Sequence, residues 1–151
     1  MKKKLIKVHT IGFTKKSAEQ FFTLLRRAGV KRVWDVRLNN VSQLAGFSKS
    51  RDLPYFLREL LGVDYTEMPL LAPTKEIRAA HPTSKGGCWA EYERKFLRLL
   101  QERQIEKHID PAQLDGACLL CSEDKPDQCH RRLVVEYLQR KWRNLNVEHL
   151  V

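Results

Sequence analysis

The segment between residues 121 and 132 holds the densest group of reactive side chains, reading Cys-Ser-Glu-Asp-Lys-Pro-Asp-Gln-Cys-His-Arg-Arg. A buried strand is expected to lead into this segment, and a helix is expected to begin near Gln128 with Asp127 as its N-cap. Cys129 and His130 would then lie in the first turn of that helix. Ligands of parallel α/β sheets bind where strands end in this way, so the segment is the first candidate for a site.

These side chains predict nucleophilic chemistry on an anion. The free N–H groups and the dipole of a helix N-terminus attract anions and lower the pKa of a nearby thiol, whose thiolate is the nucleophile. Arg131 adds donors that suit phosphate or carboxylate, so we expect it to bind substrate. The candidate catalytic residues of this segment are Cys121, Glu123, Cys129 and His130. The thiols would act as nucleophile or as its support, and Glu123 as general acid or base.

Two further groups of polar residues follow predicted strands. Asp35 and Arg37 end one strand, and their alternate spacing puts both on the same face, where they would meet a ligand together. Asp35 is therefore a second candidate for general acid or base, and Ser42 in the next loop would add a hydroxyl. Gly12, which follows Thr10 after the first strand, permits close approach of a backbone. The predicted substrate-binding residues outside the first segment are Thr10, Gly12, Arg37 and Ser42.

Cysteine spacing raises the question of a metal. Cys118, Cys121, Cys129 and His130 offer thiolates and an imidazole, the donors of a zinc site. Residues three apart in a strand point to opposite faces, so Cys118 and Cys121 would not share one ion without a bulge. We therefore predict no metal, and the chain lacks the glycine-rich dinucleotide and Walker A patterns, so we expect no cofactor. A transient disulfide between Cys121 and Cys129 stays open as an alternative.

Apolar periodicity predicts strands and helices that alternate along the chain. Strands are expected at about residues 5–11, 30–36, 63–68, 116–122 and 147–150, and helices at about 17–28, 54–61, 89–107 and 129–142. This alternation is typical of a three-layer α/β sandwich with a mostly parallel central sheet, a Rossmann-like architecture. The most apolar strand, at 116–122, should be central. We predict a single domain over residues 1–151, with 69–87 as an irregular, lid-like connection.

The charge balance favours an anionic partner. The chain has 28 Lys and Arg against 18 Asp and Glu, a net charge of +10, and such a field speeds the capture of nucleic acid and other polyanions. The N-terminus starts like a signal peptide, but Lys7 and His9 interrupt its apolar stretch. No apolar run is long enough to span a bilayer. We expect a cytoplasmic protein with an anionic ligand, nucleic acid among the candidates, and no membrane partner; the oligomeric state is left open.

Several motifs together resemble an uncharacterised family, the domain of unknown function 488. They are Thr10-Ile11-Gly12, Asp35-Val36-Arg37 with Ser42, Leu120-Cys121-Ser122-Glu123 followed by Pro126, Cys129-His130-Arg131, and the ending Val147-Glu148-His149-Leu150. The resemblance covers nearly the whole chain and implies a small α/β domain, without implying a reaction. Asn39-Asn40 departs from the family pattern, in which a proline precedes the serine.

We interpret the chain as an enzyme that acts on a phosphate-bearing substrate, a nucleic acid or nucleotide, at the carboxyl ends of the strands. Two other functions fit the same residues. A non-catalytic nucleic-acid-binding module would use its basic faces, with the reactive cluster as a structural network, and a thiol redox protein would use the two cysteines. The enzyme interpretation requires the Asp-Val-Arg and Cys-His-Arg motifs to meet in one pocket.

Overall fold

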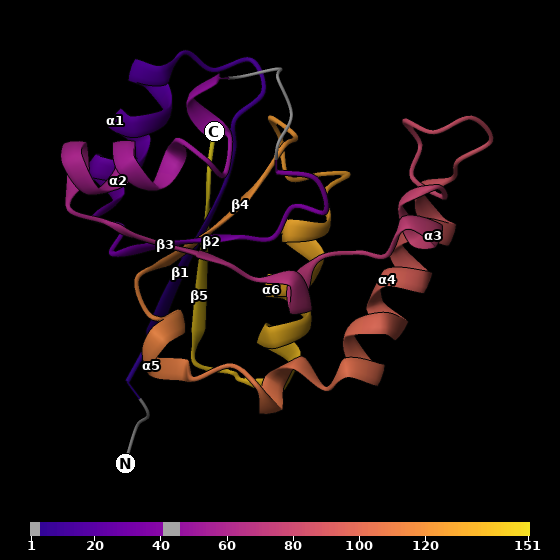
Figure 1. Cartoon of the computed structure of the whole chain (residues 1–151). Coiled ribbons are helices and arrows are strands. Elements are labelled where there is room, and N and C mark those ends of the chain that lie inside the picture. Colours follow the sequence, from indigo (N-terminus) through magenta and orange to yellow (C-terminus); the bar gives the residue numbers. More distant parts are fainter. Residues whose placement is uncertain (1–3, 41–45) are drawn as a thin grey trace.

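A five-stranded parallel sheet forms the centre of the structure, a computed structural model that describes residues 4–40 and 46–151 (Figure 1). The strands are β1 (Ile6–Gly12), β2 (Arg32–Asp35), β3 (Asp64–Glu67), β4 (Ala117–Cys121) and β5 (Leu145–Leu150). Their order across the sheet is β3-β2-β4-β1-β5, and each neighbouring pair is parallel. The predicted α/β class is confirmed, and the apolar strand β4 is central as expected.

Helices cover both faces of this sheet and make the outer two layers. They are α1 (Ala18–Ala28), α2 (Leu53–Leu61), α3 (Lys75–Arg78), α4 (Trp89–Arg103), α5 (Pro111–Leu114) and α6 (His130–Lys141), with 3-10 turns at Gly46–Ser48, Pro69–Leu71 and Ile105–Lys107. The helices α1 and α2 lie on one side of the sheet, and α4 and α6 lie on the other (Figure 1). All these connections return the chain to the same end of the sheet, so the carboxyl ends of the strands share one edge.

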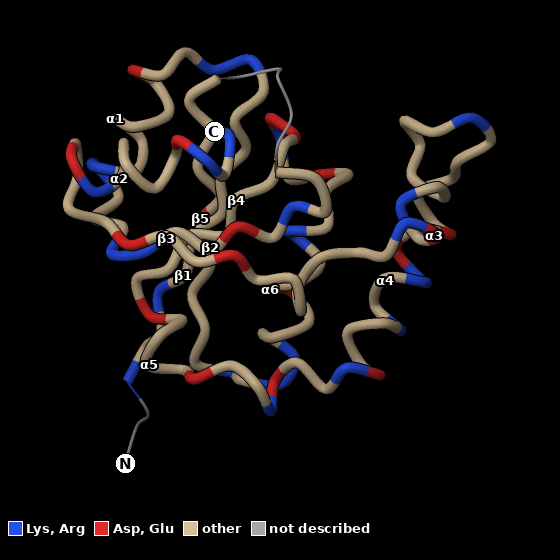
Figure 2. The backbone as a smooth tube through the Cα atoms, in the orientation of Figure 1, with Lys and Arg blue, Asp and Glu red and all other residues tan. Residues whose placement is uncertain are grey.

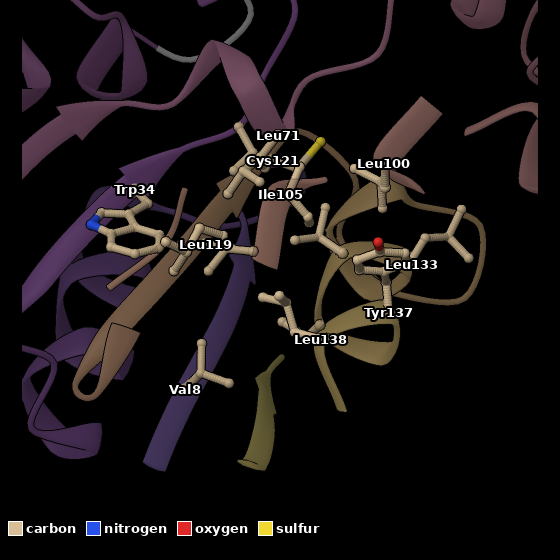
Figure 3. Close-up of a cluster of buried hydrophobic side chains, with 14 of the residues drawn as sticks. Val8, Trp34, Leu71, Leu100, Ile105, Leu119, Cys121, Leu133, Tyr137 and Leu138 are labelled. Carbon is tan, nitrogen blue, oxygen red and sulfur yellow. The ribbon is translucent and has the colours of Figure 1, made fainter. Parts of the chain in front are cut away.

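Side-chain alternation along β4 divides the core into two clusters. Leu119 and Cys121 belong to the cluster on the α4 and α6 side, whereas Cys118 and Leu120 belong to the cluster on the α1 and α2 side. Figure 3 shows the first cluster, in which Leu133 and its neighbours on α6 pack against the sheet. Cys118 and Cys121 therefore point to opposite faces of the sheet, as the alternation of side chains along a strand predicts.

The ends of α1 follow directly from its sequence. The Ser17 side chain accepts a hydrogen bond from the N–H of Gln20 at 3.1 Å, and the Gln20 side chain accepts one from the N–H of Ser17 at 2.8 Å. This capping box satisfies two N–H groups that the first turn would leave unpaired. Gly29 ends the helix with a left-handed φ of +69°. The start of α1 lies beside the loop that follows β4, since Lys16, just before the helix, forms an ion pair of 2.7 Å with Asp124.

Two helices differ at their ends from the prediction. The structure begins α6 at His130 with Cys129 as N-cap, two residues later than expected, because the N–H of Cys129 bonds to the carbonyl of Pro126 in a preceding turn. The helix predicted to run to residue 107 stops before Gln104, whose φ of +51° is left-handed. The later start of α6 places Cys129 at the junction between the loop and the helix.

Lys and Arg residues occur on helices of both faces of the sheet, interspersed with Asp and Glu (Figure 2). The residues that make up the net charge of +10 are therefore distributed over several elements of the fold. Among residues 4–40 and 46–151, no helix is both long and apolar enough to cross a bilayer.

Candidate functional site

A pocket of about 410 Å³ opens at the carboxyl end of β4, where ligands of parallel sheets bind. It is lined by Arg37, Leu38, Asn39, Pro73, Arg78, His81, Tyr92, Cys121, Ser122, Glu123, Gln128, Cys129 and His130. The lining comes from three stretches of sequence: the loop after β2, the 73–92 region, and the segment between β4 and α6. The Asp-Val-Arg and Cys-His-Arg motifs therefore meet at one pocket, as the enzyme interpretation requires.

The Cys121 thiol and the His130 imidazole form a close pair in this lining. Sγ of Cys121 lies 3.4 Å from Nδ1 of His130, and both side chains are buried. Nε2 of His130 lies 2.6 Å from the carbonyl oxygen of Val36. A carbonyl only accepts hydrogen bonds, so Nε2 carries the proton of the neutral ring and the lone pair on Nδ1 faces the thiol. A thiol beside a base held in this way is the arrangement that activates a cysteine nucleophile.

The Cys129 thiol lies beside Cys121, and their contact moves the pKa values of the two cysteines in opposite directions. The Cys129 thiol hydrogen-bonds to the Cys121 sulfur, and this bond lowers the pKa of Cys121 despite its burial. Burial and the same hydrogen bond raise the pKa of Cys129. The expectation that the helix N-terminus lowers the pKa of Cys129 is therefore wrong, because removal from water outweighs the helix dipole. Cys121 is the thiol of this pair that ionises first.

Asp35 and Arg37 form a buried ion pair, of which Arg37 lines the pocket and Asp35 does not. Arg37 Nη2 lies 2.8 Å from Asp35 Oδ2, and Nε lies 2.9 Å from Oδ1. The Tyr65 hydroxyl donates to the same carboxylate, and Arg37 also donates to the carbonyl of Ser48 at 2.6 Å. Burial and the bond to Asp35 raise the pKa of Tyr65, so its hydroxyl stays protonated. The carboxylate of Asp35 is thus committed to protein partners, which favours a positioning role over that of a general base.

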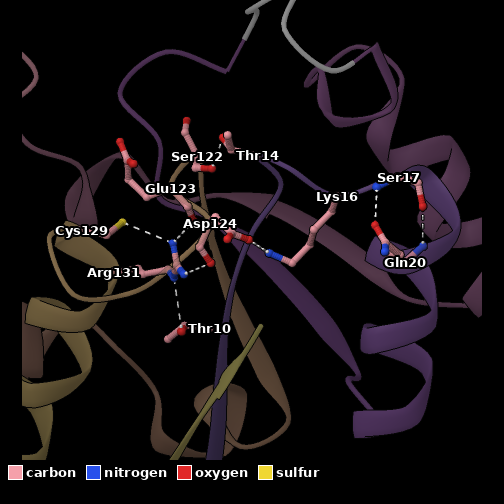
Figure 4. A network of polar contacts seen from close by, with 10 residues as sticks. All are labelled: Thr10, Thr14, Lys16, Ser17, Gln20, Ser122, Glu123, Asp124, Cys129 and Arg131. Atoms are coloured by element: carbon pink, nitrogen blue, oxygen red, sulfur yellow. Dashed lines mark hydrogen bonds and ion pairs between the residues drawn. The ribbon is translucent and has the colours of Figure 1, made fainter.

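Arg131 is fully buried, and its guanidinium binds the loop that follows β4 (Figure 4). Nη1 donates to the carbonyl of Glu123 at 2.5 Å, and Nη2 donates to the carbonyl of Asp124 at 3.2 Å. Nε donates to the Thr10 hydroxyl at 3.3 Å, and Nη1 lies 3.5 Å from the sulfur of Cys129. These contacts explain a basic residue in the first turn of a helix, since the guanidinium joins the loop to β1 and α6.

The loop after β4 also rests on the end of β1. A Cβ atom at Gly12 would collide with the carbonyl of Glu123, so the close approach predicted for this glycine is made to the protein's own backbone. Thr14 donates through its N–H to Ser122 at 3.1 Å, and Lys16 forms an ion pair of 2.7 Å with Asp124 (Figure 4). The loop that carries the pocket carboxylate is therefore held in place from both sides.

The connection between β3 and α4 contributes side chains that the sequence analysis did not select. His81 is buried, its Nε2 donates to the carbonyl of Gln128 at 2.8 Å, and its ring packs edge-on to Tyr92 with 4.9 Å between centroids. Arg78 lines the same pocket and donates to the Thr83 hydroxyl at 3.0 Å. In the sequence, only a single histidine in a proline- and glycine-rich stretch indicated that residues 73–92 line this side of the pocket.

The predicted site residues divide into three groups by position. Five line the pocket: Arg37, Cys121, Glu123, Cys129 and His130. Four lie in the surrounding network or against the loop: Thr10, Gly12, Asp35 and Arg131. Ser42 lies outside the residues that the structure describes. Within the described residues, one group of potential metal ligands exists, Cys121 with Cys129 and His130, whose ligating atoms lie within 4.8 Å of one another.

Fold and site together define a parallel α/β protein with a thiol–imidazole pair in a pocket at the carboxyl edge of its sheet. The chain belongs to the family described as Domain of unknown function DUF488, whose profile matches residues 17–138. The resemblance carried by the sequence motifs is thereby confirmed. Comparisons with curated proteins and with solved structures find no match.

Proposed function

We propose that the protein is an enzyme acting on a phosphate-bearing substrate, a nucleotide or the phosphate end of a nucleic acid, with Cys121 as its nucleophile. The observation that supports this most strongly is the 3.4 Å contact between Cys121 Sγ and His130 Nδ1 in the wall of a pocket. The pocket volume of about 410 Å³ falls in the range of small-molecule sites, about 300–1,000 Å³.

The reaction begins with transfer of the Cys121 proton to Nδ1 of His130. The thiolate then attacks phosphorus, a sulfur–phosphorus bond forms, and the bond between phosphorus and the leaving oxygen breaks. Protonated His130 returns the proton to that oxygen. Glu123, half-buried in the same lining, takes a proton from a water molecule whose oxygen attacks phosphorus. The sulfur–phosphorus bond breaks and phosphate leaves. Glu123 then loses its proton to water and the Cys121 thiolate takes one up, which restores the starting thiol.

Two features support binding of a phosphate group. Arg78 lines the pocket and, among the described residues, forms no ion pair, so its charge is available to a ligand. The N–H groups in the first turn of α6 begin next to Cys129, and a helix of 12 residues presents a positive dipole end there. Arg37 contributes shape more than charge, since Asp35 neutralises it.

The experiment compares hydrolysis of p-nitrophenyl phosphate and of nucleoside monophosphates by the wild-type protein, under reducing conditions with a chelator present. We expect turnover in the wild type and its loss, by at least about a thousandfold, in Cys121→Ser. The exposed Cys88 supplies the matched control, and Cys88→Ser should keep wild-type turnover. Equal rates in the two variants, or no turnover and no phosphate-ester binding by the wild type, would overturn the proposal.

The net charge of +10 supports a second candidate, a non-catalytic nucleic-acid-binding module. This candidate predicts binding to DNA or RNA that weakens steeply with salt because counterions are released. Binding unchanged in the Cys129→Ala and Glu123→Ala double variant, together with no hydrolysis, would favour the module over the enzyme.

The contact between Cys121 and Cys129 supports a third, a thiol redox protein. It predicts that mild peroxide treatment oxidises Cys121 to a sulfenic acid, which Cys129 then attacks to form a disulfide with release of water. Mass spectrometry that finds no Cys121–Cys129 disulfide after such treatment would exclude it.

A further inference from the structure

We infer that Cys121, Cys129 and His130 form a binding site for a thiophilic divalent cation of the zinc class. Their ligating atoms, two sulfurs and one imidazole nitrogen, lie within 4.8 Å of one another. All three side chains are buried, at 6 %, 1 % and 6 % exposure. Thiolates and imidazole are the ligands that zinc prefers.

The distance between one thiol and the imidazole suits a metal ion. A tetrahedral zinc ion, with bonds of about 2.3 Å to sulfur and about 2.0 Å to nitrogen, holds these two ligands roughly 3.6 Å apart. Cys121 Sγ and His130 Nδ1 are 3.4 Å apart in the structure. Both lie on rigid elements, since Cys121 ends the central strand and His130 begins α6.

The surroundings orient the imidazole as a ligand. The bond from Nε2 of His130 to the carbonyl of Val36 leaves Nδ1 unprotonated and facing the two sulfurs. Metal-binding histidines characteristically donate their second N–H to such a partner, which fixes the ring and raises its basicity. The Cys129 sulfur is also held in place, since Nη1 of the buried Arg131 lies 3.5 Å from it.

Three protein ligands leave the fourth position of a tetrahedral ion open. Cys121, Cys129 and His130 all line the same pocket, so the open position is directed to the space that a ligand or water would fill. Cys118 does not complete the set, because it faces the other side of the sheet. The prediction of no metal was argued from Cys118 and Cys121, which face opposite sides of the sheet, whereas Cys121, Cys129 and His130 converge.

This inference does not rest on the proposed function. A bound ion would occupy the lone pair of Cys121 and block its attack on phosphorus, so the metal-bound protein would be the inactive form of the proposed enzyme. Absence of metal binding would leave the phosphate assays unaffected, and absence of hydrolysis would leave the binding measurement unaffected.

The test titrates the reduced, metal-free full chain with Zn²⁺ in competition with a chromophoric chelator. We expect one ion per chain, and Co²⁺ in its place should give the near-ultraviolet absorption of thiolate bonded to cobalt. Cys129→Ser and His130→Gln should each weaken binding by more than about 100-fold, since loss of a ligand exceeds the effect of losing a supporting residue. Cys118→Ser, a buried thiol on the opposite face, is the matched control and should bind as the wild type does.

A measurement on the wild type alone guards against variants that fail to fold. Zn²⁺ should slow alkylation of Cys121 and leave alkylation of the exposed Cys88 unchanged. The inference is overturned if Zn²⁺ does not protect Cys121, if cobalt shows no thiolate absorption, or if Cys129→Ser binds as tightly as Cys118→Ser.

Discussion

At the scale of single residues, the site depends on polar groups whose partners are fixed by burial. Asp35 and Arg37 are both almost fully buried, and each satisfies the other's charge at 2.8 Å. His130 presents one nitrogen to a carbonyl and the other to a thiol, so the tautomer of its neutral ring follows from geometry. A buried charge that loses its partner raises the free energy of the folded state strongly. Such pairs therefore favour one arrangement of the side chains that line the pocket.

Replacing one member of the Asp35–Arg37 pair tests how much a buried charge without its partner lowers the free energy of unfolding. We expect Arg37→Ala to lower the free energy of unfolding by about 3–5 kcal/mol, because it leaves a buried carboxylate without its counter-charge. Arg58→Ala, which removes an exposed pair with Glu59, should change it by less than about 1 kcal/mol. Urea unfolding measures both, and equal effects would contradict the assigned importance of burial.

At the scale of elements, two connections hold the pocket together. The loop after β4 rests on Gly12 at the end of β1, and it is held by Arg131 from α6. The 69–87 connection is attached to the same loop through His81, whose imidazole bonds to the carbonyl of Gln128. The pocket therefore depends on contacts between loops, which local sequence patterns do not reveal.

Gly12→Ala tests the first of these contacts. The new methyl group would collide with the Glu123 carbonyl, which has backbone on both sides and cannot move without shifting the loop. We expect a loss of about 1–3 kcal/mol in the free energy of unfolding. Gly46→Ala is the control, since a Cβ there meets no atom of residues 4–40 and 46–151 within 4 Å and should cost little. Equal stability of the two variants in urea would refute the close packing of loop on strand.

His81→Ala tests the contact between the 69–87 connection and the loop after β4, which the bond from His81 to the Gln128 carbonyl makes. Removing the imidazole frees the 69–87 connection from the site, and we propose that this connection then opens as a lid would. Tryptic cleavage after the exposed Lys85 should be faster in His81→Ala than in the wild type. His108→Ala, at an exposed position, should leave the rate unchanged. Identical cleavage in all three proteins would contradict a clamping role for His81.

At the scale of the whole molecule, two histidines with lowered pKa values, His9 and His149, link folding to pH. Burial lowers the pKa of His9 and of His149, and the neighbouring Arg131 and Arg132 lower that of His149 further. The unfolded chain therefore binds more protons than the folded one below the ordinary histidine pKa of 6.5. Stability contributed by these groups is present at neutral pH and is lost as the pH falls below that value.

The lowered pKa values of His9 and His149 predict that the free energy of unfolding depends on pH. We expect the free energy of unfolding to decrease as the pH falls from 6.5 to 5, and His149→Gln to reduce the slope by up to about 1.4 kcal/mol per pH unit. The exposed His108→Gln should leave the slope unchanged. A wild-type free energy of unfolding that does not change over this interval would contradict the lowered pKa values of His9 and His149.

The sequence predicts the fold and the location of the site better than the roles of individual residues. Alternation and apolar runs identify β4 as central, and the rule for parallel sheets places polar residues at its end. The role of Arg131 depends on the carbonyls it meets, which no spacing encodes. The pKa of Cys129 depends likewise on burial by distant segments, and His81 reaches the site only through tertiary structure.

The most direct test of the account measures how fast iodoacetamide alkylates Cys121 as a function of pH, read by mass spectrometry in the presence of a chelator. The hydrogen bond from Cys129 lowers the pKa of Cys121, so half-maximal reactivity should occur at lower pH than for free N-acetylcysteine. Cys129→Ala should raise that pH. A reactivity profile of Cys121 that coincides with the free thiol, or no alkylation of Cys121 in the folded protein, would contradict the assignment of Cys121 as the nucleophile.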